Sequence, residues 1–173
     1  LNPKKVEAYY NLGNSYCNKN EYEEAIQYYV KAIALDPMHD PALYNLGYAY
    51  HRVGNLEQAI KSYRAGIQLN QKNPSSECHF NLASALYDNG QEDEALQQFK
   101  QCLAYDSENV DCILRIAGIL EDQYTRTTDT KTLLDAYSHY RKATLIDEDV
   151  EKAAEGKSRL GKLLDQHKMN YEK

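Results

Sequence analysis

Three asparagines recur at nearly equal intervals along the first two thirds of the chain. They are Asn11, Asn45 and Asn81, and the next position in the same register is Arg115. An asparagine amide offers one acceptor and two donors, so it can bond the N–H and the C=O of a peptide backbone at once. A row of such amides would hold an extended polypeptide by its backbone, without reading its side chains.

A second row, mostly aromatic, runs beside the asparagines, because Tyr10, Tyr44, Phe80 and Leu114 each precede one of those positions. We predict that both rows contact a partner. The predicted contact residues are Tyr10, Asn11, Asn14, Tyr44, Asn45, Tyr48, Phe80, Asn81 and Arg115. Replacing Asn45 and Asn81 by alanine is expected to weaken binding and to leave stability nearly unchanged. The alternative is that the asparagines only solvate a helix surface or cap a neighbouring element.

No catalytic or metal-binding constellation accompanies these rows. The 5 histidines contain no His-x-x-x-His pair, and none stands at metal-ligand spacing from a cysteine or carboxylate in two successive turns. A glycine-rich phosphate loop is also missing. We therefore expect no enzymatic activity, no cofactor and no metal.

The 4 cysteines are Cys17, Cys78, Cys102 and Cys112, separated by 61, 24 and 10 residues. This spacing fits neither a zinc knuckle nor a redox dithiol. We expect all of them to be reduced and to serve mainly as small apolar fillers, because free cysteine is among the most buried residue types. Reduced thiols predict a reducing, cytoplasmic compartment.

The elements that position the two rows repeat along the chain. Seven residues return after 34 positions and, with a two-residue insertion near Pro74 and Ser75, a third time after a further 36. A fourth copy follows after 34, but its second half is delayed by 7 residues in the threonine-rich segment 121–135. That segment is either a longer loop or two extra helical turns, since 7 residues nearly preserve helical phase. We favour the loop.

Small residues in each copy indicate where two helices cross. In the first two copies these residues are Gly13 with Ala25 and Gly47 with Ala59. A small residue at the crossing lets the helix axes approach to roughly 8–10 Å, while large neighbours fill the adjacent grooves. Each copy is thus predicted to be a helical hairpin. The hairpins must stack, because one alone buries too little apolar surface to offset its conformational entropy.

This pattern resembles the tetratricopeptide repeat (TPR), with its consensus W-x2-L-G-x2-Y, A-x3-F, an alanine and a closing proline. The first copy carries it as Tyr9, Leu12, Gly13, Tyr16, Ala25, Tyr29, Ala32 and Pro37. The resemblance implies an all-α, right-handed α-α superhelix, a TPR solenoid of four helical hairpins plus a C-terminal capping helix. In such an array the first helices line a concave groove.

The resemblance also sets the expected boundaries. Residues 1–5 would be the closing turn of an upstream repeat, since Leu1-Asn2-Pro3 matches Leu35-Asp36-Pro37, so we expect the chain to be cut from a longer array. The repeats are expected at 6–39, 40–75 with the two-residue insertion, 76–109, and 110–149 with the insertion at 121–135, followed by the capping helix at 150–173.

Two relatives within this family suggest what the groove binds. The asparagine row is similar to that of the TPR superhelix in O-linked N-acetylglucosamine transferases, which hold extended polypeptides in this way. The chaperone-tail clamp of co-chaperones matches less well, because Tyr10, Glu77 and Asn81 stand where its basic residues belong. Acidic side chains on the first helices favour an extended neutral or basic segment as the ligand.

The sequence therefore predicts a protein–protein interaction module, a scaffold or adaptor that binds an extended peptide segment or a partner protein in its concave groove. One alternative is the substrate-docking arm of a larger enzyme such as a glycosyltransferase. Another is a structural subunit of a large intracellular assembly, contacting neighbours by its convex face and ends. A formal charge of −6 without a basic patch argues against nucleic acid. The apolar stretch 113–120 is too short for membrane insertion.

Overall fold

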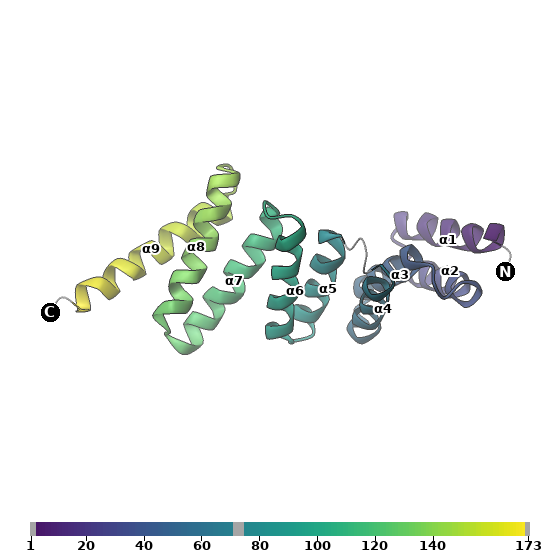
Figure 1. The fold of residues 1–173 in the computed structure, drawn as a ribbon, viewed down its shortest axis with the longest axis horizontal. Coiled ribbons are helices and arrows are strands. Elements are labelled where there is room, and N and C mark those ends of the chain that lie inside the picture. Colours follow the sequence, from purple (N-terminus) through teal and green to yellow (C-terminus); the bar gives the residue numbers. More distant parts are fainter. Residues whose placement is uncertain (1–2, 71–74, 172–173) are drawn as a thin grey trace. The chain divides into compact units, whose positions relative to one another are not determined.

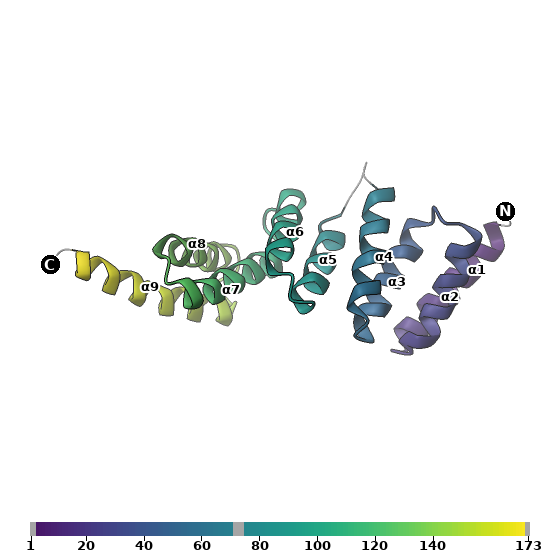
Figure 2. The same cartoon turned by 90° about the horizontal axis from the view of Figure 1, so that it is seen from below.

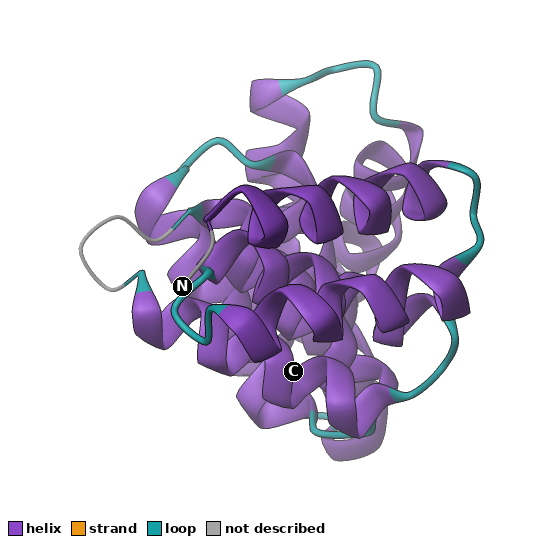
Figure 3. Cartoon of the chain, turned by 90° about the vertical axis from the view of Figure 1, so that its right-hand side faces the viewer, coloured by secondary structure: helices purple, strands orange, loops and turns teal. Residues whose placement is uncertain are grey.

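The regular structure of the chain is helical throughout the part that can be described. The computed structural model describes residues 3–70 and 75–171, with side chains up to residue 167. Every element in these ranges is an α-helix (Figures 1 and 3), which confirms the all-α prediction. The helices are α1 (Pro3–Asn18), α2 (Tyr22–Leu35), α3 (Asp40–Arg52), α4 (Leu56–Leu69), α5 (Ser76–Asp88), α6 (Glu92–Tyr105), α7 (Val110–Thr127), α8 (Thr130–Ile146) and α9 (Glu151–Tyr171).

Within each part of the chain the helices pack in the order of the sequence as successive hairpins. The chain divides into an N-terminal unit, Leu1–Gln98, and a C-terminal unit, Phe99–Lys173. In the N-terminal unit α1 pairs with α2 and α3 with α4, while α2 also packs on α3 and α4 on α5 (Figure 2). In the C-terminal unit α7 pairs with α8, and α9 covers α8.

Glycine allows the two helices of a hairpin to meet at a buried tyrosine ring. A Cβ atom built on Gly13 would lie 2.5 Å from Cε1 of Tyr29, and one on Gly47 would lie 2.7 Å from Cδ1 of Tyr63. Both tyrosine side chains are fully buried. The prediction that small residues lie at the helix crossings is confirmed at these positions. A Cβ atom built on Gly156 of α9 would likewise lie 2.7 Å from carbon atoms of the Tyr140 ring, so α9 packs like the first helix of a further hairpin.

Side-chain caps and left-handed residues set the ends of several helices. Five residues that precede a helix accept a hydrogen bond from the backbone N–H three positions later, which supplies a partner for one orphan donor of the first turn. They are His39, Asn55, Ser75, Asn109 and Asp129. Gly54 and Gly90, just beyond α3 and α5, have φ angles of +80° and +78°, where glycine is strongly favoured.

The first and the last expected segments differ in part from the structure. Pro3 to Lys5 form the first turn of α1 and not a closing turn. Proline is well suited to this position, because an N–H in the first turn of a helix would have no helical partner. Leu1 and Asn2, residues 71–74 at the two-residue insertion, and residues 172–173 of the capping segment lie outside the described residues.

The prediction of a long loop at 121–135 is wrong. α7 continues to Thr127 and α8 begins at Thr130, so only two residues separate them. Thr128 adopts the left-handed conformation, with φ of 55°, and ends α7. The extra turns are helical because they have packing partners: Leu133 is fully buried, and the Tyr124 hydroxyl lies 3.0 Å from Nε2 of His167 on α9.

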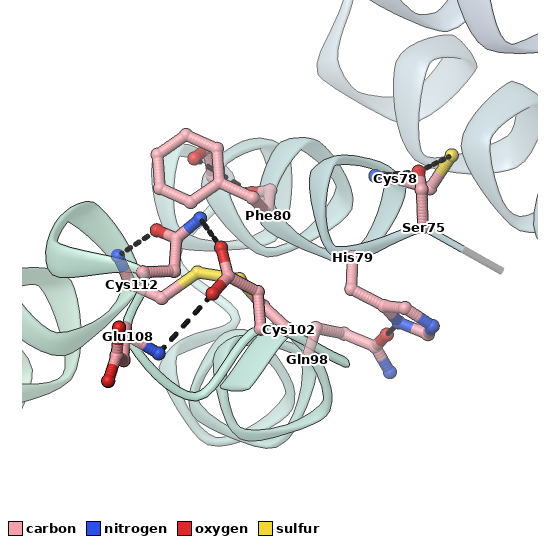
Figure 4. Close-up of a disulfide and its surroundings, with 11 residues drawn as sticks. Ser75, Cys78, His79, Phe80, Gln98, Cys102, Glu108 and Cys112 are labelled. Carbon is pink, nitrogen blue, oxygen red and sulfur yellow. Dashed lines mark hydrogen bonds between the residues drawn. A yellow bond between two sulfur atoms is a disulfide. The ribbon is translucent and has the colours of Figure 1, made fainter. Parts of the chain in front are cut away.

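The prediction of reduced cysteines is wrong for one pair. Cys102 at the end of α6 and Cys112 at the start of α7 form a disulfide (Figure 4), and both residues are fully buried. The short connection between the two helices brings their Cα atoms to 6.7 Å, which a disulfide can span. Cys17 and Cys78 are free and half-buried. The argument for a reducing compartment therefore loses its basis.

A charged cluster joins the three helices of the C-terminal unit. The Glu121 carboxylate accepts hydrogen bonds from Nε and Nη2 of Arg159 at 2.7 and 2.8 Å, and from the Tyr140 hydroxyl at 2.9 Å. Burial opposes ionisation of this carboxyl group. The hydrogen bonds from Arg159 and Tyr140 outweigh burial, so the pKa of Glu121 lies below its ordinary value of 4.5. The ionised carboxylate thus holds α9 against α7 and α8.

Glu121→Gln is expected to destabilise the chain in a pH-dependent way. Because the folded-state pKa of Glu121 is depressed, its stabilising effect is complete above the ordinary pKa and is lost as the pH falls through the folded-state value. Arg159 is half-exposed, so we expect a difference in unfolding free energy of about 1 kcal/mol at pH 7. Urea unfolding of both chains from pH 7 to pH 3 should show this difference shrinking toward zero. A difference that stays constant over this range would refute the role of the charge.

Candidate functional site

Six of the nine predicted contact residues line two hollows in the N-terminal unit. The first hollow, of about 230 Å³, is bordered by Tyr10, Tyr44 and Asn45. The second, of about 430 Å³, is bordered by the same Tyr44 and Asn45 and by Asn14, Tyr48 and Asn81. The hollows share several lining residues and therefore adjoin. We call the two together the N-terminal groove.

The groove residues lie on the first helix of each hairpin. Tyr10 and Asn14 are one helical turn apart on α1, and Tyr44 and Tyr48 have the same spacing on α3. Residues four apart lie on the same face of a helix, so each helix presents two groove residues one above the other. All of these side chains are half-buried, which leaves part of each accessible to a ligand.

The asparagine amides bond the preceding hairpin. Nδ2 of Asn45 donates to the Tyr10 hydroxyl at 3.4 Å and to Oδ1 of Asn14 at 2.8 Å. Nδ2 of Asn81 donates to the Tyr44 hydroxyl, so the asparagine-to-tyrosine bond repeats between hairpins. It does not continue along the sequence, since Phe80 lacks a hydroxyl and Arg115 replaces the next asparagine.

At Asn45 this arrangement corrects the expectation that each amide offers both donors and acceptors to a ligand. Both N–H groups of Asn45 and one of Asn81 are engaged within the chain. Neither Oδ1 atom is used as an acceptor by a described residue. It also corrects the expectation of unchanged stability, because alanine at both positions removes bonds between hairpins.

The tyrosine hydroxyls beneath the groove differ between the first two hairpins. The Tyr29 hydroxyl donates to Oδ1 of Asn14 at 2.8 Å. Tyr63 is the equivalent of Tyr29 in the next repeat. The residue of that repeat equivalent to Asn14 is Tyr48. The Tyr63 hydroxyl is buried and has no hydrogen-bond partner within the described residues. Burial raises the pKa of both tyrosines above the ordinary value of 10.0, so both remain neutral at physiological pH.

The other three predicted contact residues line neither hollow. Asn11 is exposed on α1, where its amide lies 3.5 Å from Oε1 of Glu7. Phe80 is half-buried on α5 (Figure 4), and Arg115 is exposed on α7 of the C-terminal unit. Their participation in binding stays a prediction.

The structure adds lining residues that the sequence did not single out as contacts. Glu77 borders both hollows, Asp40 the first, and Asn18 the second. A signal for Asn18 was available, because it follows Asn14 by one helical turn. Asp40 and Glu77 both lie in the first turn of a helix, α3 and α5 respectively, so equivalent helix starts place two carboxylates on one side of the groove.

The described residues contain no group of three or more His, Cys, Asp or Glu side chains arranged to hold a metal ion. None of the described helices combines the length and the apolar character that crossing a membrane requires.

Known proteins resemble this chain in sequence pattern and in fold. Family models described as "TPR repeat" and "Tetratricopeptide repeat" match residues 13–54 and 40–108. No curated protein sequence matches the chain. A crystal structure of MamA protein covers 98% of this chain and 88% of its own length, with a TM-score of 0.83 and 20% identity.

A second solved structure has a comparable fold. The crystal structure of YrrB, described as a TPR protein with an unusual peptide-binding site, covers 95% of this chain and 80% of its own length. Its TM-score is 0.78 at 18% identity. Similarity at such low identity shows the fold alone.

Proposed function

Because the chain belongs to the tetratricopeptide-repeat family, we propose that it is a protein–protein interaction module whose N-terminal groove binds an extended peptide segment of a partner protein. The observation that carries this proposal is the groove itself, in which amide oxygens and tyrosine rings from three successive hairpins border adjoining hollows. The module would serve as a scaffold or adaptor. The description of YrrB as peptide-binding supports this mode of recognition for the fold.

The contacts available in the groove suit an extended backbone. In an extended segment the backbone N–H groups have no partner within their own chain, and the Oδ1 atoms of Asn45 and Asn81 are acceptors. Successive residues of such a segment rise about 3.3 Å and point to alternate sides. Alternate side chains can therefore pack on the rings of Tyr44 and Tyr48 while the backbone bonds the amides.

Asn45→Ala combined with Asn81→Ala is expected to weaken peptide binding about 10- to 30-fold, because two hydrogen bonds of about 1 kcal/mol each are lost. The ligand would be obtained by selecting a random 12-residue peptide library on the immobilised chain. Affinity would then be measured by fluorescence anisotropy. Unfolding should become easier by about 1–2 kcal/mol, since bonds to Tyr10 and Tyr44 are also removed.

A matched variant separates the loss of binding from the loss of stability. Tyr10→Phe combined with Tyr44→Phe removes two of the three bonds between hairpins, leaves the bond from Asn45 to Asn14, and keeps both amides and both rings. It should be destabilised somewhat less and lose at most about threefold in affinity. Equal losses of affinity in the two double variants would show that the amides do not contact the peptide. Unchanged affinity in both would place the ligand outside the groove.

A further inference from the structure

The first hollow is bordered by two carboxylates and by no basic side chain. Asp40 and Glu77 line it, and the second hollow adds no lysine, arginine or histidine. Other carboxylates in the same unit have partners, such as Asp88 with His51 at 2.7 Å. Among the residues that the structure describes, neither Asp40 nor Glu77 forms an ion pair. Negative charge at the groove is therefore left uncompensated by the described part of the chain.

Several hydrogen-bond donors at the groove are already used within the chain. The amide hydrogens of Asn45 are used on Asn14 and Tyr10, and the Tyr44 hydroxyl accepts from Asn81. Burial and the nearby carboxylate of Glu77 both raise the pKa of Tyr44, so its hydroxyl stays protonated beside that carboxylate. A ligand that complements this set must bring donors, and positive charge would be favoured over negative charge.

The Tyr63 hydroxyl, buried behind residues that line the groove, also lacks a hydrogen-bond partner among the described residues. The Tyr63 side chain is 1% exposed. The Tyr63 ring lies 5.6 Å from the ring of Tyr44, and the hydroxyl interacts electrostatically with Tyr48, Cys78 and Glu77, which line the hollows. Buried hydroxyls are normally satisfied.

The chain already shows how its tyrosines hold a cation. The Arg52 guanidinium lies 4.7 Å from the centre of the Tyr22 ring and 5.7 Å from that of Tyr48, and its Nη1 donates to the Tyr48 hydroxyl at 2.7 Å. No cation lies over the rings of Tyr10 and Tyr44 within the described ranges. His39 packs against Tyr10, but its ring lies 3.8 Å from the Glu7 carboxylate and does not line the hollow.

From these observations we propose that the first hollow is a subsite for one arginine or lysine side chain of the bound segment, held by Glu77 and Asp40 between the rings of Tyr10 and Tyr44. The carboxylates supply charge-assisted hydrogen bonds and the rings supply cation–π contacts. This inference rests on the proposed function. It adds the requirement for one basic side chain to a groove that otherwise contacts the backbone of the peptide.

A double-mutant cycle between the groove and the peptide tests the subsite. Peptides would be selected from a random 12-residue library on the full chain, and the most enriched basic position would be replaced by glutamine in a synthetic copy. We expect this replacement to lower affinity about tenfold or more on the unsubstituted chain, as for a hydrogen bond to a charged group. On Glu77→Gln the same replacement should change affinity less than about threefold, because the charge partner is already gone.

Glu57→Gln provides the matched control, since it makes the same charge change at an exposed position on α4 that lines neither hollow. It should retain the tenfold effect of the peptide replacement.

The outcomes distinguish the subsite from the proposed function. Peptides that require Asn45 and Asn81 but show no enrichment of arginine or lysine would overturn the subsite and leave peptide binding in place. The subsite would also be overturned if the effect of the peptide replacement were equal on the unsubstituted chain and on Glu77→Gln. Peptides that bind equally well to the Asn45 and Asn81 double variant would overturn both proposals.

Discussion

Reduction of the Cys102–Cys112 disulfide is expected to lower the free energy of unfolding by about 2–3 kcal/mol. The disulfide closes a short loop, with a sequence separation of 10, and a loop of this length restricts the unfolded chain by about that amount. Urea unfolding of the oxidised chain with and without a reductant measures the difference. The largest effect should appear in the C-terminal unit, because both cysteines belong to it.

Two variants identify the disulfide as the cause. Cys17→Ser combined with Cys78→Ser leaves only the bonded pair, so the reductant should destabilise it by the same amount. Cys102→Ala combined with Cys112→Ala should show no response to reductant. Alkylation of the unfolded, unreduced chain should modify two thiols. Modification of all four would show that the disulfide does not form.

Gly13→Ala is expected to destabilise the chain by about 2 kcal/mol. The new methyl group would lie 2.5 and 2.6 Å from two carbon atoms of the Tyr29 ring, which is fully buried and has little room to retreat. Such overpacking costs about 1–3 kcal/mol, and a shifted ring also strains the bond from its hydroxyl to Asn14, worth about 1 kcal/mol. The helix propensity of alanine returns at most about 1 kcal/mol.

Gly118→Ala is the matched control for this prediction. Gly118 lies within α7, and a Cβ atom there would meet nothing within 4 Å. The same substitution should therefore stabilise the chain by about 0.5–1 kcal/mol, from helix propensity alone. Thermal or urea unfolding of the two variants should give changes of opposite sign. If both substitutions stabilised the chain, the glycine–tyrosine contact would not limit the packing of α1 on α2.

The helical hairpins could be predicted from sequence because their signal is local and repeats. Gly13 and Gly47 recur with a fixed separation from Tyr29 and Tyr63, and helix geometry turns that separation into a contact. The apolar row of the last segment likewise predicted a packed helix, and Ala153 and Leu160 are buried in α9. These features depend on positions within one repeat or between adjacent ones.

The insertion and the disulfide could not be predicted because they depend on packing between elements. Threonines in 121–135 suggested a loop, but His167, far along the sequence, gives Tyr124 a partner on an added helical turn. The separation of Cys102 and Cys112 matches no short cysteine motif. Only the turn between α6 and α7 brings the two residues together.

The shared face of the contact residues and its acidic character were predicted, but the hydrogen bonds among those residues were not. The register of Asn45 and Asn81 indicated which face of the helices they share. It did not reveal that each amide lies within reach of a tyrosine hydroxyl one hairpin back, so that three of the four amide N–H groups are used and the oxygens remain. Glu77 adds a carboxylate to this groove, and a carboxylate favours a ligand that carries positive charge and hydrogen-bond donors.

The claim that the groove residues contact a peptide is tested most directly by the side-chain amide signals of the chain in NMR spectra. The signals of Asn14, Asn45 and Asn81 would be assigned by single substitutions and followed during titration with a library-selected peptide. We predict saturable shifts of these three signals, together with the ring signals of Tyr44, at one common affinity. Shifts confined to exposed amides such as Asn11 and Asn89, with those three signals unmoved at saturation, would contradict the account.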